Sequence, residues 1–127
     1  MATIEDVRRL AVTLPGVTEG PDGVRWLVAG RPFAWAWMER VDPRKPRLLN
    51  PRVIAVRVRD EAEKRERLAA NPDSCFTEPH YDGYPAVLVR LEALTPDALE
   101  AVLREAWLTR APASLAQSGL GYTAEPG

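Results

Sequence analysis

The chain has 127 residues, of which 46% are hydrophobic and 28% are charged, a composition typical of one soluble globular domain. A single cysteine excludes an internal disulfide, and no apolar run reaches the roughly 20 residues of a membrane-spanning helix. The net charge of −1 differs from the strong basic excess of most nucleic-acid-binding domains. The first residues lack a basic-then-apolar leader pattern, so we expect a cytoplasmic protein with no membrane partner.

The N-terminal segment has the pattern of an amphipathic helix. Thr3 is a favourable N-cap, and Asp6 three residues later completes a capping box with a shortened acid. Apolar residues then recur at helical spacing as far as Leu14. Pro15 and Gly16 end the predicted helix.

Residues 24–38 predict a β-hairpin. Two short runs of β-favouring residues flank the turn-forming segment 29–32. In the second run, Phe33, Trp35 and Trp37 alternate with smaller residues. Because successive side chains of a strand point to opposite faces, we expect the three aromatic rings on one face of a sheet, buried beneath a helix.

The middle of the chain predicts a loop, a strand and a helix in turn. Residues 42–52 contain three prolines and four basic residues, and we expect a loop because each proline lacks an N–H donor. Residues 53–59 predict a strand in which Val56 and Val58 alternate with arginines. Asp60 then caps a charged helix that extends to about residue 70.

The last part of the chain predicts two strands and a helix. Residues 75–77 and 86–91 are the strand candidates, and a turn over residues 78–85 joins them. Thr95 opens the helix with the clearest amphipathic pattern of the chain. Residues 113–127 are small and polar, and we expect a loosely ordered C-terminal tail.

These elements give the order α-β-β-β-α-β-β-α over residues 1–112, which predicts one α+β domain with helices packed against an antiparallel β-sheet. Segments of this domain are similar, in order and spacing, to the MmcQ/YjbR family of small bacterial proteins: Thr3–Ala11, Leu14–Glu19, Trp26–Ala34, Arg67–Pro72, Pro79–Tyr81 with Gly83, Val87–Leu91 and Ala106-Trp107. The resemblance covers roughly residues 3–112. It implies a frataxin-like (CyaY-like) sandwich and DNA binding by a double-wing arrangement.

Basic residues are concentrated in one part of the sequence, because residues 40–67 hold ten basic and five acidic residues. If this part binds DNA, its side chains contact phosphates, which supply affinity but little sequence information. The alternative is a solvated loop whose arginines pair with the acidic residues that follow it. The candidate DNA-binding residues are Arg31, Arg44, Lys45, Arg47, Arg57 and Arg59.

Polar and aromatic residues gather in the turn over residues 78–85, where His80, Tyr81 and Tyr84 form an alternative ligand-binding site. His80 is five residues from Cys75, so a thiolate–imidazole pair is one interpretation, and a buried structural cysteine is the one we favour. One histidine and one cysteine are too few ligands for a metal site. No phosphate-binding glycine motif is present.

We expect a small bacterial protein without a catalytic site or cofactor, and the resemblance implies that it binds double-stranded DNA, through phosphate contacts of the basic residues. We expect it to be a monomer or a weak homodimer. The competing prediction is a module that binds a protein or a small ligand through the aromatic turn Pro79–Pro85. Tryptophans can also stack on nucleotide bases, but Trp26, Trp35 and Trp37 are expected in the core, with Trp107 in the apolar stripe of the last helix.

Overall fold

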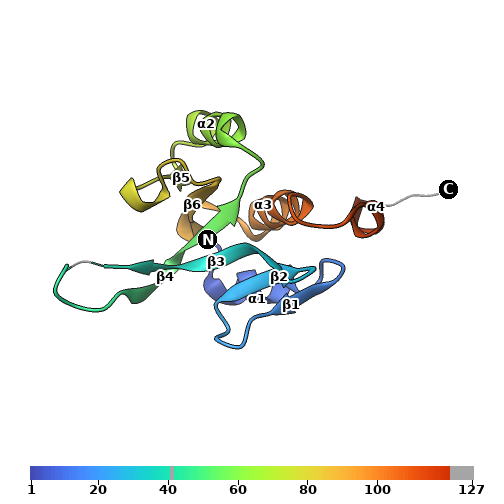
Figure 1. Cartoon of the computed structure of the whole chain (residues 1–127), viewed down its shortest axis with the longest axis horizontal. Helices are drawn as coiled ribbons and strands as arrows, with labels where there is room; N and C mark the ends of the chain where they lie inside the picture. Colours follow the sequence, from blue (N-terminus) through green and yellow to red (C-terminus); the bar gives the residue numbers. More distant parts are fainter. Residues whose placement is uncertain (41, 121–127) are drawn as a thin grey trace.

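A six-stranded antiparallel sheet with the strand order β1-β2-β3-β4-β6-β5 forms the centre of the computed structural model, which describes residues 1–40 and 42–120 (Figure 1). The strands are β1 (Val17–Glu19), β2 (Arg25–Val28), β3 (Arg31–Glu39), β4 (Leu48–Arg57), β5 (Cys75–Phe76) and β6 (Ala86–Arg90). The helices are α1 (Ile4–Ala11), α2 (Glu61–Ala70), α3 (Pro96–Leu108) and α4 (Ala113–Leu120), with short 3₁₀ helices η1 (Pro79–Tyr81) and η2 (Leu91–Ala93). The α+β class and the antiparallel sheet predicted from the sequence are confirmed.

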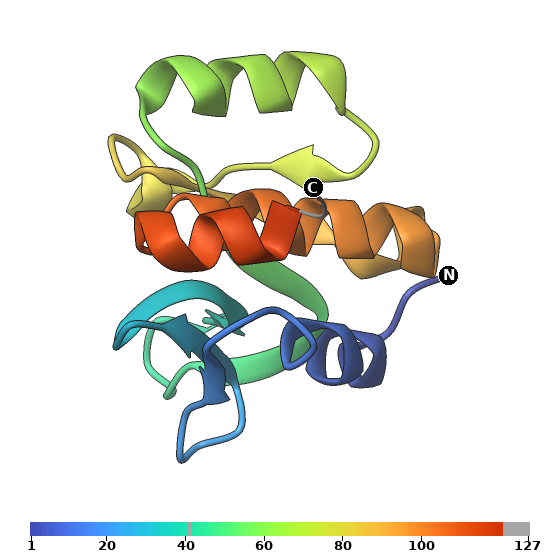
Figure 2. The ribbon, with the colours of Figure 1, turned by 90° about the vertical axis from the view of Figure 1, so that its right-hand side faces the viewer.

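Predicted caps begin three of the helices. Thr3 and Asp6 form a reciprocal capping box at the start of α1, and Asp60 and Thr95 accept backbone N–H groups at the starts of α2 and α3. In Figure 2, α3 lies between α2 and α1. None of the helices in the described ranges is long and apolar enough to cross a membrane.

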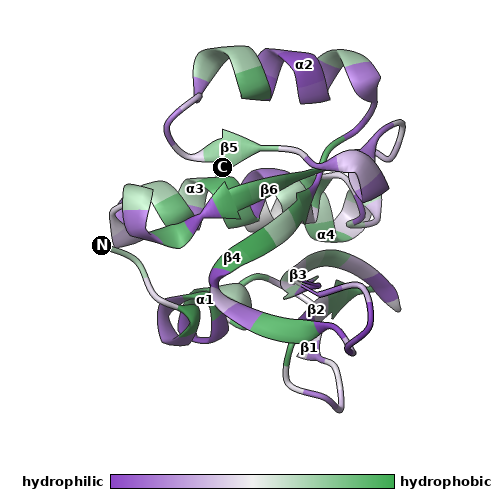
Figure 3. Cartoon of the chain, turned by 90° about the vertical axis from the view of Figure 1, so that its left-hand side faces the viewer, coloured by the Kyte–Doolittle hydropathy of each residue, from purple (hydrophilic) through white to green (hydrophobic). Residues whose placement is uncertain are grey.

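The two central strands divide their side chains between two apolar clusters. On one face, Ile54 and Val56 of β4 join Val87 and Val89 of β6 in the main core, which α1 and α3 cover. On the other face, the buried residues are fewer and aromatic side chains pack over them. This second cluster contains Val53, Ala55 and Leu88 with Trp35, Trp37, Phe76 and Tyr81. Figure 3 shows β6 and the adjoining half of β4 as hydrophobic, and most of α2 as hydrophilic.

A bulge in β3 separates the three aromatic residues that the alternation predicted on one face. Trp26 pairs with Ala34 but Leu27 pairs with Pro32, so Phe33 is an extra residue in the register. Phe33 joins the main core under the helices, whereas Trp35 and Trp37 lie on the other face. The single-face prediction is wrong because one inserted residue reverses the alternation that follows it.

The predicted loop over residues 42–52 is shorter than expected, because β4 already begins at Leu48. The register of β3 and β4 shifts where Ala36 pairs with Ile54 and Trp37 pairs with Asn50. Pro51 falls within this shift, where no ladder hydrogen bond needs its missing N–H. The ends of β3 and β4 therefore form a ribbon that projects from the rest of the domain (Figure 1).

Two elements are absent from the predicted order. The three-residue strand β1 pairs with β2, and helix α4 occupies the first part of the predicted loose tail. The prediction of a loose tail is wrong for residues 113–120, because the alanines and leucines here favour a helix and Leu115 packs against the main core. Residues 121–127 lie outside the described part of the chain.

Candidate anion-binding site

A hollow of about 490 Å³ lies where one end of the sheet meets the end of α3. We call it the arginine hollow and define it by its lining residues, which are Arg25, Pro32, Trp35, Arg57, His80, Tyr81, Tyr84 and Arg110. Arg25 and Trp35 are register partners on β2 and β3, so their side chains share the aromatic face of the sheet. The hollow unites residues that the sequence separates by as many as 85 positions.

Three aromatic side chains form one wall of the hollow. The Trp35 indole N–H donates a 3.1 Å hydrogen bond to the Tyr81 hydroxyl. Tyr84 meets Tyr81 edge to face with ring centroids 5.9 Å apart, and meets Trp35 in the same manner at 6.3 Å. Burial raises the pKa of the Tyr81 hydroxyl, which therefore stays protonated at neutral pH. The wall is neutral, aromatic and fixed by its own contacts.

Lys64 of α2 holds the turn that carries these tyrosines. Its side chain is 2% exposed, and its ammonium donates to the carbonyl oxygens of Tyr81 and Tyr84, the second at 2.9 Å. The sequence analysis missed this residue because it treated α2 as a charged surface helix. The available signal was its position four residues before Leu68, which places both side chains on the same face of the helix.

Three arginines also line the hollow: Arg25, Arg57 and Arg110. Arg57 donates to the Tyr84 hydroxyl at 3.3 Å, and its guanidinium lies over the Tyr84 ring, 5.3 Å from the centroid. Burial lowers the pKa of Arg110, and the positive charges of Arg57 and Arg31 lower it further. The Nε of Arg110 is buried without a hydrogen-bond partner.

Apart from that of Arg25, these guanidinium groups lack carboxylate neighbours in the described ranges. Neither Arg31, Arg57 nor Arg110 forms an ion pair there, while Arg25 pairs with Asp22 at 3.3 Å. Like charges held close together repel each other, so the folded chain carries an electrostatic cost at this place. An anion bound between the guanidiniums would offset that cost, which makes the hollow a candidate anion-binding site.

The six residues predicted to bind DNA do not form one surface. Arg57 lines the hollow together with Arg110, whereas Arg31 does not line it and acts on Arg110 through its charge. Arg47 lies at the edge of the hollow, with Nη2 3.0 Å from the Nε2 atom of His80. The exposed Arg44 pairs with Asp42 at 3.3 Å, and its hydrogen bonds lower the pKa of that carboxyl group. Lys45 is exposed in the same loop.

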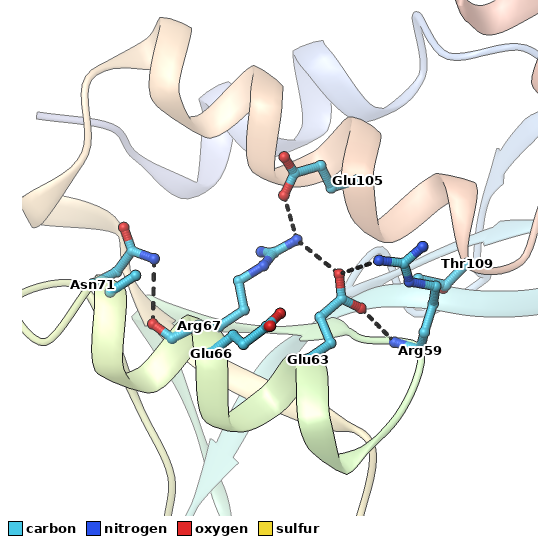
Figure 4. Close-up of a pocket in the computed structure, with 8 residues that line it drawn as sticks. Arg59, Glu63, Glu66, Arg67, Asn71, Glu105 and Thr109 are labelled. Atoms are coloured by element: carbon cyan, nitrogen blue, oxygen red, sulfur yellow. Dashed lines mark hydrogen bonds and ion pairs between the residues drawn. The ribbon is translucent and has the colours of Figure 1, made fainter.

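Arg59, the sixth predicted residue, belongs to a second hollow between α2 and α3 (Figure 4). There Glu63 pairs with Arg59 at 3.5 Å and with Arg67 at 3.8 Å, and Arg67 also contacts Glu105. Each arginine of this network is paired with a carboxylate, and the pair of Arg67 with Glu105 joins α2 to α3. For Arg59, the alternative interpretation of pairing with acidic residues is confirmed.

Cys75 and His80 do not form the pair that their spacing allowed. Cys75 is 7% exposed on β5 within the main core, as expected for a structural cysteine. His80 instead lies between Arg47 and Glu78, whose carboxylate is 3.3 Å from Nδ1. Over the described residues, no group of three or more metal-ligating side chains comes together.

The tryptophans divide into two pairs. Trp26 and Trp107 are fully buried, as predicted. Trp35 and Trp37 are only half-buried, on the aromatic face of the sheet. The prediction that Trp35 belongs to the core is therefore corrected, because this ring also lines the arginine hollow.

Known proteins resemble the chain in sequence and in fold. No family model matches it. The uncharacterized proteins Mb2600 of Mycobacterium bovis and Rv2570 of Mycobacterium tuberculosis are each 39% identical to it over 127 residues, which cover 94% of this chain and 97% of theirs. The crystal structure of Deinococcus radiodurans protein DR2400, a DUF419 domain, superposes with a TM-score of 0.60 at 23% identity, covering 85% of this chain and 78% of that one. That likeness shows a shared fold. The chain belongs to the same family as these mycobacterial proteins.

Proposed function

We propose that the protein is a non-enzymatic DNA-binding protein whose phosphate contacts centre on the arginine hollow. The observation that carries the proposal is that Arg57 and Arg110 line the same hollow while neither forms an ion pair in the described ranges. Arginine is well suited to phosphate because its planar guanidinium presents paired N–H donors. Contacts of this kind bind the DNA backbone without reading its sequence.

The projecting ribbon of β3 and β4 supports the same proposal. Arg47 lies at the edge of the hollow, while Arg44 and Lys45 lie in the exposed loop of the ribbon. DNA carries phosphates at regular intervals, so a backbone that enters the hollow can also pass the ribbon. In this arrangement the ribbon is a secondary contact, and Arg59 takes no part because Glu63 neutralises it.

We further propose that the family is MmcQ/YjbR, that the protein acts in the bacterial cytoplasm, and that it is a monomer or a weak homodimer. The similarity of the motifs supports the family assignment, and the mycobacterial relatives support a bacterial source. A single buried cysteine is consistent with a reducing compartment. The absence of contact between Cys75 and His80 in the described structure leaves that pair without a nucleophile–base geometry.

Fluorescence anisotropy of a labelled random duplex tests the proposal. At about 50 mM salt we expect saturable binding, and at about 200 mM salt a much weaker affinity, since bound phosphates release counterions. The variant Arg57→Glu/Arg110→Glu should bind at least about tenfold more weakly, and its dependence of log K on log salt should be less steep by about two. The variant Arg44→Glu/Lys45→Glu should lose less, because Arg44 is already paired with Asp42.

The control for charge reversal outside the hollow is Arg65→Glu, since Arg65 is exposed on α2 and does not line the hollow. It should bind duplex within about twofold of the unchanged chain. The proposal fails if the Arg57/Arg110 variant binds as well as this control, or if the unchanged chain does not bind at the lower salt concentration.

A second candidate is a module that binds a protein or a small ligand through the aromatic turn. Tyr84 is 42% exposed, an unusual exposure for a large aromatic side chain held in place by several contacts. Apolar docking at this turn would change little between the two salt concentrations, so the same titration separates the candidates.

A further inference from the structure

We propose that the arginine hollow accepts an unpaired nucleotide, with its base against the aromatic wall and its phosphate between Arg57 and Arg110. This inference rests on the proposed function, because it names the form of nucleic acid that the same site prefers. It predicts that a single strand binds more tightly than a duplex of equal length.

The contents of the hollow match both parts of a nucleotide. Trp35, Tyr81 and Tyr84 supply aromatic surface, and Arg57 and Arg110 supply positive charge beside it. The guanidinium of Arg57 already lies over the Tyr84 ring, so charge and ring surface are adjacent. Sites for single strands combine these two features, since bases stack on aromatic rings while cations follow the backbone.

The geometry of the aromatic wall suits an added ring. Both ring pairs in the wall meet at steep angles, 63° for Trp35 with Tyr84 and 79° for Tyr81 with Tyr84. No two rings of the wall therefore stack flat against each other, so a flat-stacked ring would have to come from a ligand. The volume of about 490 Å³ lies within the range of small-ligand pockets, about 300–1,000 Å³.

A base pair within a duplex cannot use this wall. In B-DNA the faces of each base are covered by its neighbours, and only the edges are accessible in the grooves. A ring that enters the hollow must come from a single strand, a strand end or a free nucleotide. Duplex DNA would contact the arginines alone.

The wall is positioned before any ligand arrives. Lys64 holds the carbonyl groups of Tyr81 and Tyr84, and Trp35 holds the Tyr81 hydroxyl. A site with few side chains left to order loses less conformational entropy when it binds. The fixed positions of the rings therefore favour the binding of a base to the wall.

The experiment compares three labelled probes in anisotropy titrations at one low salt concentration. They are an oligothymidylate of about ten nucleotides, an abasic strand of the same length and a duplex of the same length. We expect the oligothymidylate to bind about tenfold or more tightly than the abasic strand, which offers phosphates without bases. It should also bind more tightly than the duplex.

Tyr84→Leu is the informative variant and Tyr84→Phe is its matched control. The leucine removes the ring from an exposed position, so we expect about a tenfold loss for oligothymidylate and no change for the abasic strand. The phenylalanine keeps the ring and removes only the hydroxyl that Arg57 contacts, so its oligothymidylate affinity should stay within about threefold. Circular dichroism and thermal unfolding confirm that both variants fold.

Competition with thymidine monophosphate and with thymidine shows whether the ligand is a free nucleotide or a nucleotide within a single strand. Displacement by the monophosphate but not by thymidine supports a free nucleotide as ligand, whereas tight binding of the strand without such displacement supports a strand.

Equal binding of oligothymidylate and the abasic strand, or no effect of Tyr84→Leu, overturns the inference. If the duplex still binds in that case and Arg57→Glu/Arg110→Glu weakens it, DNA binding stands without base stacking. If no nucleic acid binds, both proposals fail.

Discussion

Lys64 shows how one buried side chain can determine the shape of a site that it does not line. Its ammonium replaces water with the carbonyl oxygens of Tyr81 and Tyr84, which also accept the backbone N–H groups of Tyr84 and Ala86 respectively. A charge removed from water is tolerated only when such partners satisfy it. The turn and α2 therefore depend on each other through this contact.

Replacing Lys64 with methionine should destabilise the domain by about 1–3 kcal/mol, because the carbonyl groups of the turn lose a charged donor. Chemical denaturation with urea measures this change. Arg65→Met on the exposed side of the same helix is the matched control and should change the free energy of unfolding by less than about 0.5 kcal/mol. A Lys64→Met protein as stable as this control would show that the lysine does not hold the turn.

At the scale of single elements, the start of α1 links helix capping to pH. The side chain of Arg9 and the backbone N–H of Thr3 donate to the carboxylate of Asp6, and they lower its pKa below the ordinary value of 3.8. The unfolded chain then binds a proton more readily than the folded one. The contribution of Asp6 is therefore fully present above about pH 4 and is lost as the pH falls through the lower folded value.

The variant Asp6→Asn should consequently show a shallower loss of stability between about pH 4 and pH 2 than the unchanged chain. Thermal unfolding across that range measures the slope. Asp97→Asn at the start of α3 provides a comparison with an acid for which no capping-box contact exists in the described structure. Parallel slopes for the unchanged chain and Asp6→Asn would contradict the role of the capping box.

The tight turn between β2 and β3 contains a residue in an unfavourable backbone conformation. Ala29 has φ of 53° and Gly30 has φ of 75°, a pair of positive values that suits Asn-Gly better than Ala-Gly. Ala29 is exposed, so its side chain contributes little packing. Ala29→Asn should raise the free energy of unfolding by about 0.5–1 kcal/mol in urea denaturation, and Ala29→Val should lower it.

The long elements were predictable and the short or irregular ones were not, for physical reasons. The capped helices have periodic apolar faces, and β6 is a continuous apolar run, so local pattern identifies them. The three residues of β1 are too few to show a period. The bulge at Phe33 and the shift at Pro51 arise from pairing with neighbouring strands, which no local window contains.

At the scale of the whole molecule, charges that are neighbours in the sequence separate in the fold. The basic segment 40–67 divides between the ribbon, the arginine hollow and the ion pairs that join α2 to α3. Arg25 and Arg110 come from outside that segment and complete the hollow. Counting charges along the sequence identifies the basic segment, but it does not predict the hollow. Arg25 and Arg110 reach the hollow only through the order of the strands and the position of the end of α3. The one local signal is that Arg110 is one of three cations, with Arg90 and Arg104, among residues 68–127, which hold eight acidic residues.

The repulsion within the hollow couples the stability of the whole domain to anions. An anion that binds only the folded chain stabilises it by mass action. At constant ionic strength, exchange of chloride for phosphate should raise the melting temperature by about 5 °C at tenfold excess over its dissociation constant. Arg110→Gln should reduce this rise and should itself melt at a higher temperature in dilute chloride, since repulsion is relieved. An unchanged phosphate effect in Arg110→Gln would contradict an anion site at this place.

The contacts that attach α2 to the domain restrict where insertions and deletions can occur in this family. Apolar contacts tolerate sliding and rotation, but α2 is attached largely by directional bonds, from Lys64 on one side and from Arg67 to Glu105 on the other. A single residue inserted or deleted between Lys64 and Arg67 would turn one of them by about 100° relative to the other, and both attachments could not be kept. Relatives that retain the site should therefore vary in length on either side of α2 and keep the interval between these two cations unchanged.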